Sequence, residues 1–388
     1  MKLVQQPSIR ILHVVGGMNR GGIETWLMHI LRHIDRDRYQ MDFLVHTTQT
    51  CAYDDKIRSI GSKIIPCLHP SKPQLYARNF KRILREYGPY DIIHSHVHHF
   101  SGYVLRLAHQ VGIPSRIAHS HNDTSSIEAR AGLYRRLYFA LTRWWVFRYA
   151  TLGLGCSRDA LANLFGSTWE TDPRWRVLYY GIDLTLFQDF VNPIAVRTEL
   201  GIPADAFVVG HVGRFDEQKN HKFLVEIAAE VAKREPKMRL LLVGDGPLRP
   251  SIEQKVAQLG LTDMVIFAGI RSDTPRLMLG AIDMFLFPSL HEGLPLVLLE
   301  AQAAMLPCIF SNAITEEVEI VKPLMQRICL SQPASAWAKA VLAARDTASA
   351  NKQPEALNKM IHSPFNIMKG LANLTDVYSL ASENAKST

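Results

Sequence analysis

Two carboxylates flank a predicted helix start within residues 283–307. Met284–Phe287 is a short apolar run that Pro288 stops, as expected of a buried parallel strand ending at the edge of a sheet. Glu292 follows in a loop and Glu300 lies on the predicted helix, with seven residues between them. Ligands of open α/β sheets bind outside the carboxyl ends of the strands, so both carboxylates are candidate ligand-binding groups.

The chemistry of this loop suits a ligand that carries both an anion and hydroxyl groups. The backbone N–H groups of Gly293 and Leu294 would face an anion near the helix start. A carboxylate beside an anion needs a partner of its own, and sugar hydroxyls donate hydrogen bonds to carboxylates. Taken alone, the pattern also fits an ordinary strand–loop–helix with two solvated glutamates.

Two cations follow a second predicted strand. Phe207–Val212 is followed by Gly213 and Arg214, and Lys219 comes five residues later. Arginine can hold a phosphate through two hydrogen bonds and lysine acts as a point charge, whereas two unrelated surface cations are the alternative. A third strand ends at Gly244, in a tight turn into the next helix.

The N-terminal region has a glycine loop between a strand and a helix. Ile9–Val15 is largely β-branched and apolar, and Gly21 and Gly22 precede a helical pattern. Such a loop lets the backbone approach a diphosphate. The glycines do not have the GxGxxG spacing, so the dinucleotide-binding fingerprint is absent.

Histidines gather at two places in the first half of the chain. His94, His96 and His98 are expected to share one face of a strand, and His119 and His121 end a later strand. A metal site is one interpretation, but metal-binding histidines usually belong to a fuller set of matching ligands. The other interpretation is that they line a cleft at strand ends or bond to backbone groups.

Length and composition narrow the class of protein. The 388 residues favour two domains, and a net charge of +8 with a pI of about 9.2 suits an anionic surface or substrate. No nucleic-acid motif accompanies the charge, so a membrane surface or phosphate is the better match. Five unpatterned cysteines, no signal core and no run that spans a bilayer indicate a cytoplasmic protein.

The order of predicted elements indicates an α/β fold. Alternating strands and helices predict two parallel, doubly wound sheets. The first domain would span residues 1–190, with Gly153–Ser157 as its last strand, and the second would span residues 206–363. The linker would run through Pro193–Ala206.

Residues 129–150 form an unusual segment in which five arginines alternate with aromatic and aliphatic residues, including Trp144 and Trp145. A basic amphipathic helix with aromatic residues is typical of a membrane interface. The commoner case is a surface helix that packs its apolar stripe on the sheet and leaves its arginines in water.

Several motifs together resemble the retaining glycosyltransferases of family four, which have the GT-B fold. Glu292 and Glu300 match the E-x7-E signature of that family, and Val212 to Asn220 resembles its Val-Gly-Arg-(x4)-Lys-Asn segment. The resemblance covers about residues 9–380, with the motifs in the expected order. Within the family, the chain resembles in particular the enzymes of bacterial exopolysaccharide and capsule biosynthesis.

The resemblance implies two Rossmann-like domains that face a central cleft. Residues 1–190 would bind the acceptor and residues 206–363 the donor, while helix 364–382 would return to the N-terminal domain. Two positions depart from the family pattern. Tyr180 replaces an asparagine, which puts a side-chain amide role in doubt, and Met305 replaces a common glycine, which implies tighter packing there.

The resemblance also implies roles for single residues. Arg214 and Lys219 would neutralise charge on the leaving diphosphate. Glu300 would take the ribose hydroxyls, and Glu292 would hold sugar hydroxyls and orient the anomeric carbon. The expected catalytic residues are His121, Glu292, Arg214 and Lys219, and the expected donor-binding residues are Gly21, Gly22, Arg214, Lys219, Gly244, Ile270, Glu292, Gly293, Leu294 and Glu300.

On the acceptor side, the resemblance points to His121 first and His119 second. A histidine there could hydrogen-bond the donor sugar or tune the attacking hydroxyl. Gly21 and Gly22 would face the donor diphosphate, and the main chain around Ile270 would contact the nucleobase.

The implied reaction moves a sugar from a nucleotide-diphosphate sugar, in the first place a uridine diphosphate sugar, to a saccharide or polyprenyl-linked acceptor. Anomeric configuration would be retained without a metal or a cofactor. An anionic inner membrane face is a further candidate partner, and the oligomeric state is open. The alternatives are a nucleotide-sugar 2-epimerase, for which Asp123 and Glu128 would be the acid–base candidates, and a non-catalytic nucleotide-sugar-binding protein.

Overall fold

The computed structural model of the protein forms two compact units. One comprises Met1–Gly181 with Ile367–Thr388, and the other comprises Ile182–Asn366. The residues that the structure describes are 8–122, 124, 128, 131–348 and 355–386. Each unit contains one sheet of parallel strands with helices packed against it, which confirms the predicted α/β class with two Rossmann-like domains.

The sheet of the N-terminal unit has seven strands in the order β3-β2-β1-β4-β5-β6-β7. Its strands are β1 (Ile9–Val15), β2 (Tyr39–Val45), β3 (Ile64–Pro66), β4 (Ile92–Ser95), β5 (Ser115–Ser120), β6 (Leu152–Gly155) and β7 (Trp175–Val177). The prediction that the strand near residue 153 is the last one was wrong. β7 is a three-residue edge strand with no apolar run of its own, so periodicity does not reveal it.

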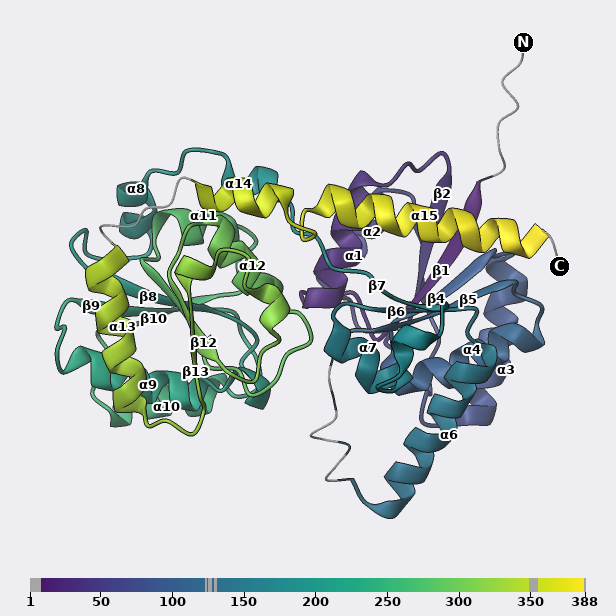
Figure 1. The fold of residues 1–388 in the computed structure, drawn as a ribbon, viewed down its shortest axis with the longest axis horizontal. Coiled ribbons are helices and arrows are strands. Elements are labelled where there is room, and N and C mark those ends of the chain that lie inside the picture. Colours follow the sequence, from purple (N-terminus) through teal and green to yellow (C-terminus); the bar gives the residue numbers. More distant parts are fainter. Residues whose placement is uncertain (1–7, 123, 125–127, 129–130, 349–354, 387–388) are drawn as a thin grey trace, which may run out of the picture. The chain divides into compact units, whose positions relative to one another are not determined.

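Helices of the N-terminal unit connect these strands. They are α1 (Gly22–His33), α2 (Asp54–Ser59), α3 (Pro73–Tyr87), α4 (Ser101–Gln110), α6 (Leu133–Tyr149), α7 (Arg158–Phe165) and α15 (Ile367–Lys386), with 3-10 turns η1 (His98–Phe100) and η2 (Trp169–Thr171). α15, the yellow helix of Figure 1, comes from the far end of the chain and contacts α1, β4 and β5. Its Tyr378 hydroxyl lies 2.8 Å from His94 Nδ1, so the last helix reaches the centre of the sheet.

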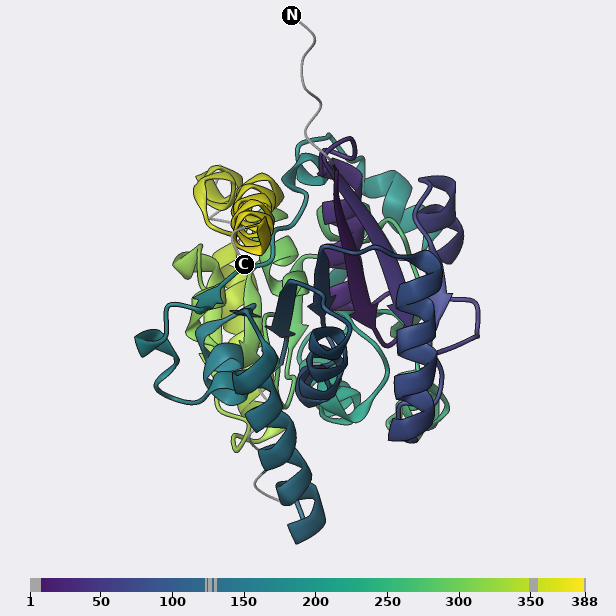
Figure 2. The same cartoon turned by 90° about the vertical axis from the view of Figure 1, so that its right-hand side faces the viewer.

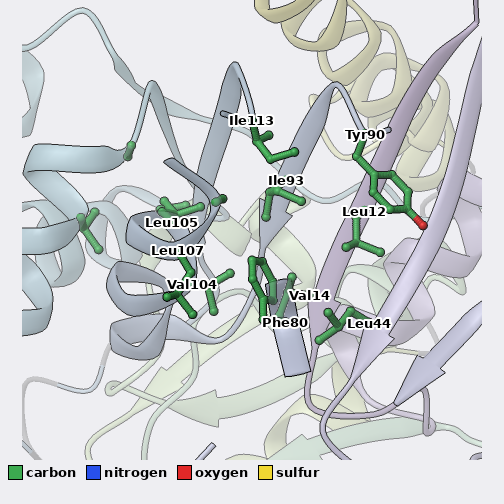
Figure 3. Packing of buried hydrophobic residues seen from close by; sticks show 14 of the residues in the cluster. Leu12, Val14, Leu44, Phe80, Tyr90, Ile93, Val104, Leu105, Leu107 and Ile113 are labelled. Carbon is green, nitrogen blue, oxygen red and sulfur yellow. The ribbon is translucent and has the colours of Figure 1, made fainter. Parts of the chain in front are cut away.

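The core on one side of this sheet is built from apolar strand residues and two helices. Leu12 and Val14 of β1 and Ile93 of β4 pack with Phe80 of α3 and Val104 of α4, and all five are fully buried (Figure 3). Burying each such side chain stabilises the fold by about 1.5–3 kcal/mol relative to exposure. This layer holds β1 and β4 next to each other in the sheet.

The sheet of the C-terminal unit has six strands in the order β10-β9-β8-β11-β12-β13. Its strands are β8 (Phe207–Val212), β9 (Met238–Val243), β10 (Val265–Gly269), β11 (Met284–Phe287), β12 (Cys308–Ser311) and β13 (Met325–Ile328). Its helices are α8 (Pro193–Glu199), α9 (His221–Ala232), α10 (Arg249–Gln258), α11 (Thr274–Gly280), α12 (Leu296–Ala303), α13 (Ala334–Ala348) and α14 (Glu355–His362), with 3-10 turns η3 (Leu184–Phe187), η4 (Glu217–Lys219), η5 (Glu316–Val318) and η6 (Lys322–Leu324).

The expected linker Pro193–Ala206 belongs to the C-terminal unit instead. Its first part is α8, which Asn192 caps by accepting hydrogen bonds from the first backbone N–H groups. Val196 of α8 packs so closely on α11 that a Cβ on Gly280 would come within 2.6 Å of it. In the sequence, Pro193 indicated a break between the domains. Proline also suits the first turn of a helix, and here it begins α8.

Strand order reverses once in each sheet. β8 lies between β9 and β11, and β1 lies between β2 and β4. In each sheet the chain therefore builds outward on one side of the first strand and later returns to add strands on its other side. A crevice opens at the carboxyl ends of the strands at such a switch point, and ligands of open α/β sheets bind there. The loops after β8 and β11 carry Arg214, Lys219 and Glu292 of the predicted donor site, and the histidines lie on β1 and at or just beyond the ends of β4 and β5.

Met305 has a conformation that explains the glycine usual at its position. Its φ is +60°, in the left-handed region. The N–H groups of Met305 and Leu306 bond to Gln302 O at 3.0 Å and Ala301 O at 2.9 Å, which is a Schellman end to α12. The expected tighter packing was wrong, because Met305 is 39% exposed and the constraint lies in the backbone.

Replacing Met305 by glycine should therefore stabilise the protein. A left-handed non-glycine residue costs about 1–2 kcal/mol, of which the greater chain entropy of glycine offsets a part. We expect Met305→Gly to raise the free energy of unfolding by about 1 kcal/mol in urea titrations, and Met305→Ala, which keeps the Cβ atom, to give no such gain. Equal stability of the two variants would contradict this explanation.

Candidate functional site

The loops after β8 and β11 are joined by an ion pair at the switch point of the C-terminal unit. Lys219 Nζ lies 2.6 Å from Glu292 Oε1, and the two side chains are only 17% and 8% exposed. Gln218 Nε2 donates to Glu292 Oε2 at 3.0 Å and to the carbonyl of His291 at 2.9 Å. Sequence analysis did not identify Gln218, whose place beside Lys219 was the only signal.

Local backbone geometry presents Lys219 to this site. Asp216 directly precedes η4, and its carboxylate caps this turn by accepting from Lys219 N at 3.3 Å. Asn220 then adopts a left-handed conformation with φ +54°, which asparagine tolerates better than most residues. Its side chain donates to Pro288 O at 3.2 Å, so the turn that follows Lys219 is attached to the loop after β11.

Arg214 lies in the loop after β8 with its side chain exposed. Among the described residues it forms no side-chain hydrogen bond or ion pair, so its guanidinium can bind an anion. Gly244, at the end of β9, lies directly against this loop, because a Cβ there would come within 2.1 Å of Gly213 O. Gly244 also has φ +133°, so the turn after β9 requires glycine for both reasons.

The remaining predicted donor residues lie around α12 and β10. Gly293 and Leu294 are buried just before α12 begins, and no described residue accepts a hydrogen bond from their backbone N–H groups. Glu300 lies on α12, and burial raises the pKa of its carboxyl to about 7. Both its protonated and ionised forms are therefore present near neutral pH. Ile270 follows β10 and is 63% exposed.

The glycine loop of the N-terminal unit leads into α1. Gly21 is the residue before the helix, and Thr25 N donates to its carbonyl at 2.9 Å. Gly22 is the first helical residue, and Gly21 has no side chain with which to cap the helix. The carboxylate of Glu24 lies against Gly21 in the first turn, and the approach of this loop to a diphosphate stays a prediction.

Five buried histidines form a cluster at the switch point of the N-terminal unit. His13 Nδ1 lies 2.9 Å from His96 Nε2, and His96 Nδ1 lies 2.8 Å from His121 Nε2. His94 Nε2 lies 3.1 Å from His119 Nδ1. Every ring therefore bonds to another ring, and each of the five side chains is at most 5% exposed.

The prediction that His94, His96 and His98 share a strand face was wrong. β4 ends at Ser95, and His98 begins η1 with φ +48°, outside the cluster. His13 of β1, which sequence analysis missed, belongs to the cluster in place of His98. The available signal was a single imidazole inside an apolar strand two residues before the strand ends.

Burial keeps the cluster neutral. It lowers the pKa of His13 to about 3, and burial with the neighbouring imidazoles lowers the pKa of the other four rings well below 6.5. A neutral imidazole offers one donor and one acceptor. Because His96 occupies Nε2 of His121, the nitrogen left for a ligand is Nδ1, which has no partner among the described residues.

In the part of the chain that the structure describes, two sets of three rings could hold a metal ion. They are His13 with His94 and His96, and His96 with His119 and His121, and in each set the three ligand atoms lie within 4.8 Å of one another. Both sets share His96, whose two nitrogens already bond to other rings. The arrangement offers only neutral ligands, so a bound dication would lack a compensating carboxylate.

Aromatic packing surrounds the two histidines predicted for the acceptor side. Tyr180 stacks on Trp26 with ring centroids 4.8 Å apart and on His121 at 5.5 Å. The tyrosine that replaces the usual asparagine is thus part of the aromatic wall of the cluster. His119 and His121 are both buried, and each has one ring nitrogen without a partner among the described residues, so the ranking of His121 before His119 stays a prediction.

Of the two carboxylates considered for epimerase chemistry, Asp123 lies outside the described residues and only Glu128 can be placed. Glu128 pairs with His99 at 2.8 Å and with Arg143 at 3.1 Å. Burial alone would raise its pKa, but hydrogen bonds from Thr124, His99 and Asn163 lower it to about 2. Glu128 is therefore an ionised structural group and no proton donor at neutral pH.

Comparison with known proteins places the chain in a family. The model for Glycosyltransferase Family 4 matches residues 20–186, and the model for Glycosyl transferases group 1 matches residues 194–360. The putative glycosyltransferase EpsF of Bacillus subtilis is 37% identical over 380 residues, covering 96% of this chain and 97% of EpsF. This chain belongs to the family 4 glycosyltransferases. Sequence analysis had identified the family and the enzyme class correctly.

Other relatives extend the comparison. The UDP-Gal:alpha-D-GlcNAc-diphosphoundecaprenol alpha-1,3-galactosyltransferase of Escherichia coli is 27% identical, over 74% of this chain and 75% of that enzyme. The Anabaena protein HepE, solved in complex with UDP-glucose, has a TM-score of 0.78 and 20% identity, with 96% of this chain and all of HepE covered. The likeness confirms the GT-B fold. Among the relatives is also a capsular polysaccharide biosynthesis glycosyltransferase of Staphylococcus aureus.

The neutral histidine cluster predicts acid instability of the N-terminal unit. A histidine whose pKa is lowered on folding binds its proton only in the unfolded chain, so stability is complete above pH 6.5 and falls as the pH falls below it. At about pH 5.5 each such ring costs about 1.4 kcal/mol. Urea unfolding of this enzyme should show a clearly lower stability at about pH 5.5 than at about pH 7.5.

The variant His13→Leu supplies the comparison for this prediction. It removes one of the five titrating rings, so the difference in stability between the two pH values should shrink by about one histidine's share. An unchanged difference, or equal stability of the parent enzyme at both pH values, would show that the rings are not held neutral by the fold.

Proposed function

We propose that this glycosyltransferase moves a sugar from a nucleotide-diphosphate sugar, in the first place a UDP-sugar, to a saccharide or lipid-linked acceptor during assembly of a bacterial surface polysaccharide. The observation that carries the proposal is the Lys219–Glu292 ion pair beside the exposed Arg214 at the β8/β11 switch point. Support comes from HepE, solved with UDP-glucose, and from the Escherichia coli relative, whose name specifies a UDP-galactose donor and a lipid-linked acceptor.

In this proposal the C-terminal unit binds the donor through opposite charges. The guanidinium of Arg214 binds the diphosphate with two parallel hydrogen bonds, and Lys219 adds a second positive charge. As the bond to the anomeric carbon breaks, negative charge grows on the diphosphate. Both cations are already in place for it, so this charge is stabilised without a metal ion and without reorganisation.

The two glutamates bind hydroxyl groups in the same proposal. Glu292 keeps one oxygen on Lys219 and one on Gln218, and the remaining lone pairs accept from sugar hydroxyls. Glu300 accepts from the ribose hydroxyls in its ionised form. Because the pKa of the Glu300 carboxyl is about 7, part of the enzyme carries this proton at neutral pH, and binding of a ligand that prefers the carboxylate releases it.

The N-terminal unit binds the acceptor in this proposal. Nδ1 of His121 is buried and has no partner among the described residues, and in this proposal it bonds to an acceptor hydroxyl that reaches into the cluster, while the bond to His96 holds the ring. Attack takes place on the face that the diphosphate leaves, which retains the anomeric configuration. Family membership and the structural role of Glu128 both favour sugar transfer over the epimerase and the non-catalytic alternatives.

Donor binding can be tested by isothermal titration with a panel of nucleotides and nucleotide sugars. One uridine or guanosine diphosphate sugar should bind selectively. Arg214→Ala and Glu300→Ala should each weaken that binding roughly ten- to hundredfold, since hydrogen bonds to charged groups contribute about 1.5–3 kcal/mol. Arg234→Ala, which removes an exposed arginine beyond the far end of α9, is the control and should bind normally.

Retention can be tested by following the sugar released from the donor when water is the acceptor. Proton NMR before mutarotation should show that the first sugar released from a UDP-α-sugar is the α anomer. Release of the β anomer would contradict retention. A sugar epimerised at C2 and still attached to the nucleotide would instead support the epimerase.

A further inference from the structure

α6 turns an apolar stripe toward solvent. Leu133, Leu137, Leu141 and Trp144 follow one another at helical spacing along one side of the helix. They are 72%, 60%, 46% and 57% exposed. Figures 1 and 2 both show the first half of α6 projecting beyond the other helices of the N-terminal unit. No described helix, α6 included, is both long and apolar enough to cross a membrane.

The opposite side of α6 attaches the helix to its unit. Its buried residues are Thr142 and Val146, which lie about half a turn away from the apolar stripe. α4 approaches so closely that a Cβ on Gly102 would come within 2.1 Å of Thr142 O. The apolar stripe therefore does not pack on the sheet, which corrects the commoner interpretation of this sequence. Ala129 and Arg130 of the predicted segment lie outside the described residues.

The exposed charge on α6 is positive. α6 contains four arginines and no acidic residue. Arg143 is paired with Glu128, and Arg135, Arg136 and Arg148 are exposed. Arg148 lies in line with the stripe and Arg136 lies beside it, whereas Arg135 lies about half a turn away. A second copy of this helix packed on the first would bring the exposed arginines of both together without acidic partners on either helix. The charge therefore argues against self-association through this face.

We propose that α6 docks on an anionic lipid bilayer. A bilayer with anionic headgroups satisfies both halves of the observation, because leucine and tryptophan enter the interface while arginines bind lipid phosphates. The net charge of +8 adds long-range attraction to the same surface. This inference stands on the exposure and charge of α6 and does not depend on the donor proposal.

Vesicle co-sedimentation of the full chain tests the docking. We expect binding to vesicles of phosphatidylcholine mixed with phosphatidylglycerol, little binding to phosphatidylcholine alone, and weaker binding as salt increases. Leu137→Glu and Trp144→Glu should abolish binding, and Arg136→Ala and Arg148→Ala should each weaken it about fivefold. All four side chains are exposed, so the fold should tolerate the changes, which thermal unfolding can verify.

Matched changes in the C-terminal unit complete the design. Phe190→Glu alters an apolar residue that is 92% exposed, and Arg234→Ala removes an exposed arginine, so neither should affect docking. Binding that is indifferent to lipid charge, or that survives Leu137→Glu in a folded protein, would overturn the proposal. A dimer in the absence of vesicles, detected by sedimentation velocity and dissociated by Leu137→Glu, would also overturn the proposal. In that case a second copy of the chain would cover the stripe.

Discussion

The ion pair between Lys219 and Glu292 is the interaction on which the candidate donor site depends. It joins residues from two loops that are distant in sequence and adjacent only because β8 and β11 are neighbours in the sheet. Both side chains are largely covered, so removing either one would leave the other as a poorly solvated charge. The fold thereby keeps a cation and a carboxylate side by side where the strand order reverses, before any ligand arrives.

The switch points of the two units of this glycosyltransferase carry opposite kinds of side chains, charged in one unit and neutral in the other. In the C-terminal unit the groups are charged, which suits the diphosphate of the proposed donor. In the N-terminal unit the groups are buried imidazoles kept neutral by desolvation, with His121 at the end of a chain of hydrogen bonds that begins at His13. Neutral donors and acceptors suit the hydroxyl group of an acceptor, which carries no charge before it reacts. The proposed division of roles between the units thus has a counterpart in their electrostatics.

Much of this arrangement could be predicted from the sequence, because short apolar runs stopped by glycine or proline mark the ends of buried strands. That rule placed Arg214, Lys219 and Glu292 at the carboxyl ends of parallel strands. It could not show that Lys219 and Glu292 touch, since their pairing depends on strand order rather than on local pattern. It also could not find β7 and β13, which are short edge strands without a clear apolar run.

Other features depend on which surface covers which, and periodicity carries no such information. The pattern of residues 129–150 showed an apolar stripe and basic residues, but only the packing of α6 on Gly102 shows that the stripe faces solvent. His13 gave a weak signal in sequence because one histidine in a strand is common, and its place in the cluster follows from the adjacency of β1 and β4. The left-handed backbone at Met305 could likewise not be predicted from the residue itself, because methionine rarely adopts a positive φ.

A crystal structure of the enzyme with an intact UDP-sugar tests the central claim most directly. The account predicts that the diphosphate contacts Arg214 and Lys219, that the ribose hydroxyls lie on Glu300, and that the sugar hydroxyls lie on Glu292 in the C-terminal unit. A UDP-sugar bound away from the loops after β8 and β11, with the Lys219–Glu292 pair untouched by it, would contradict the account.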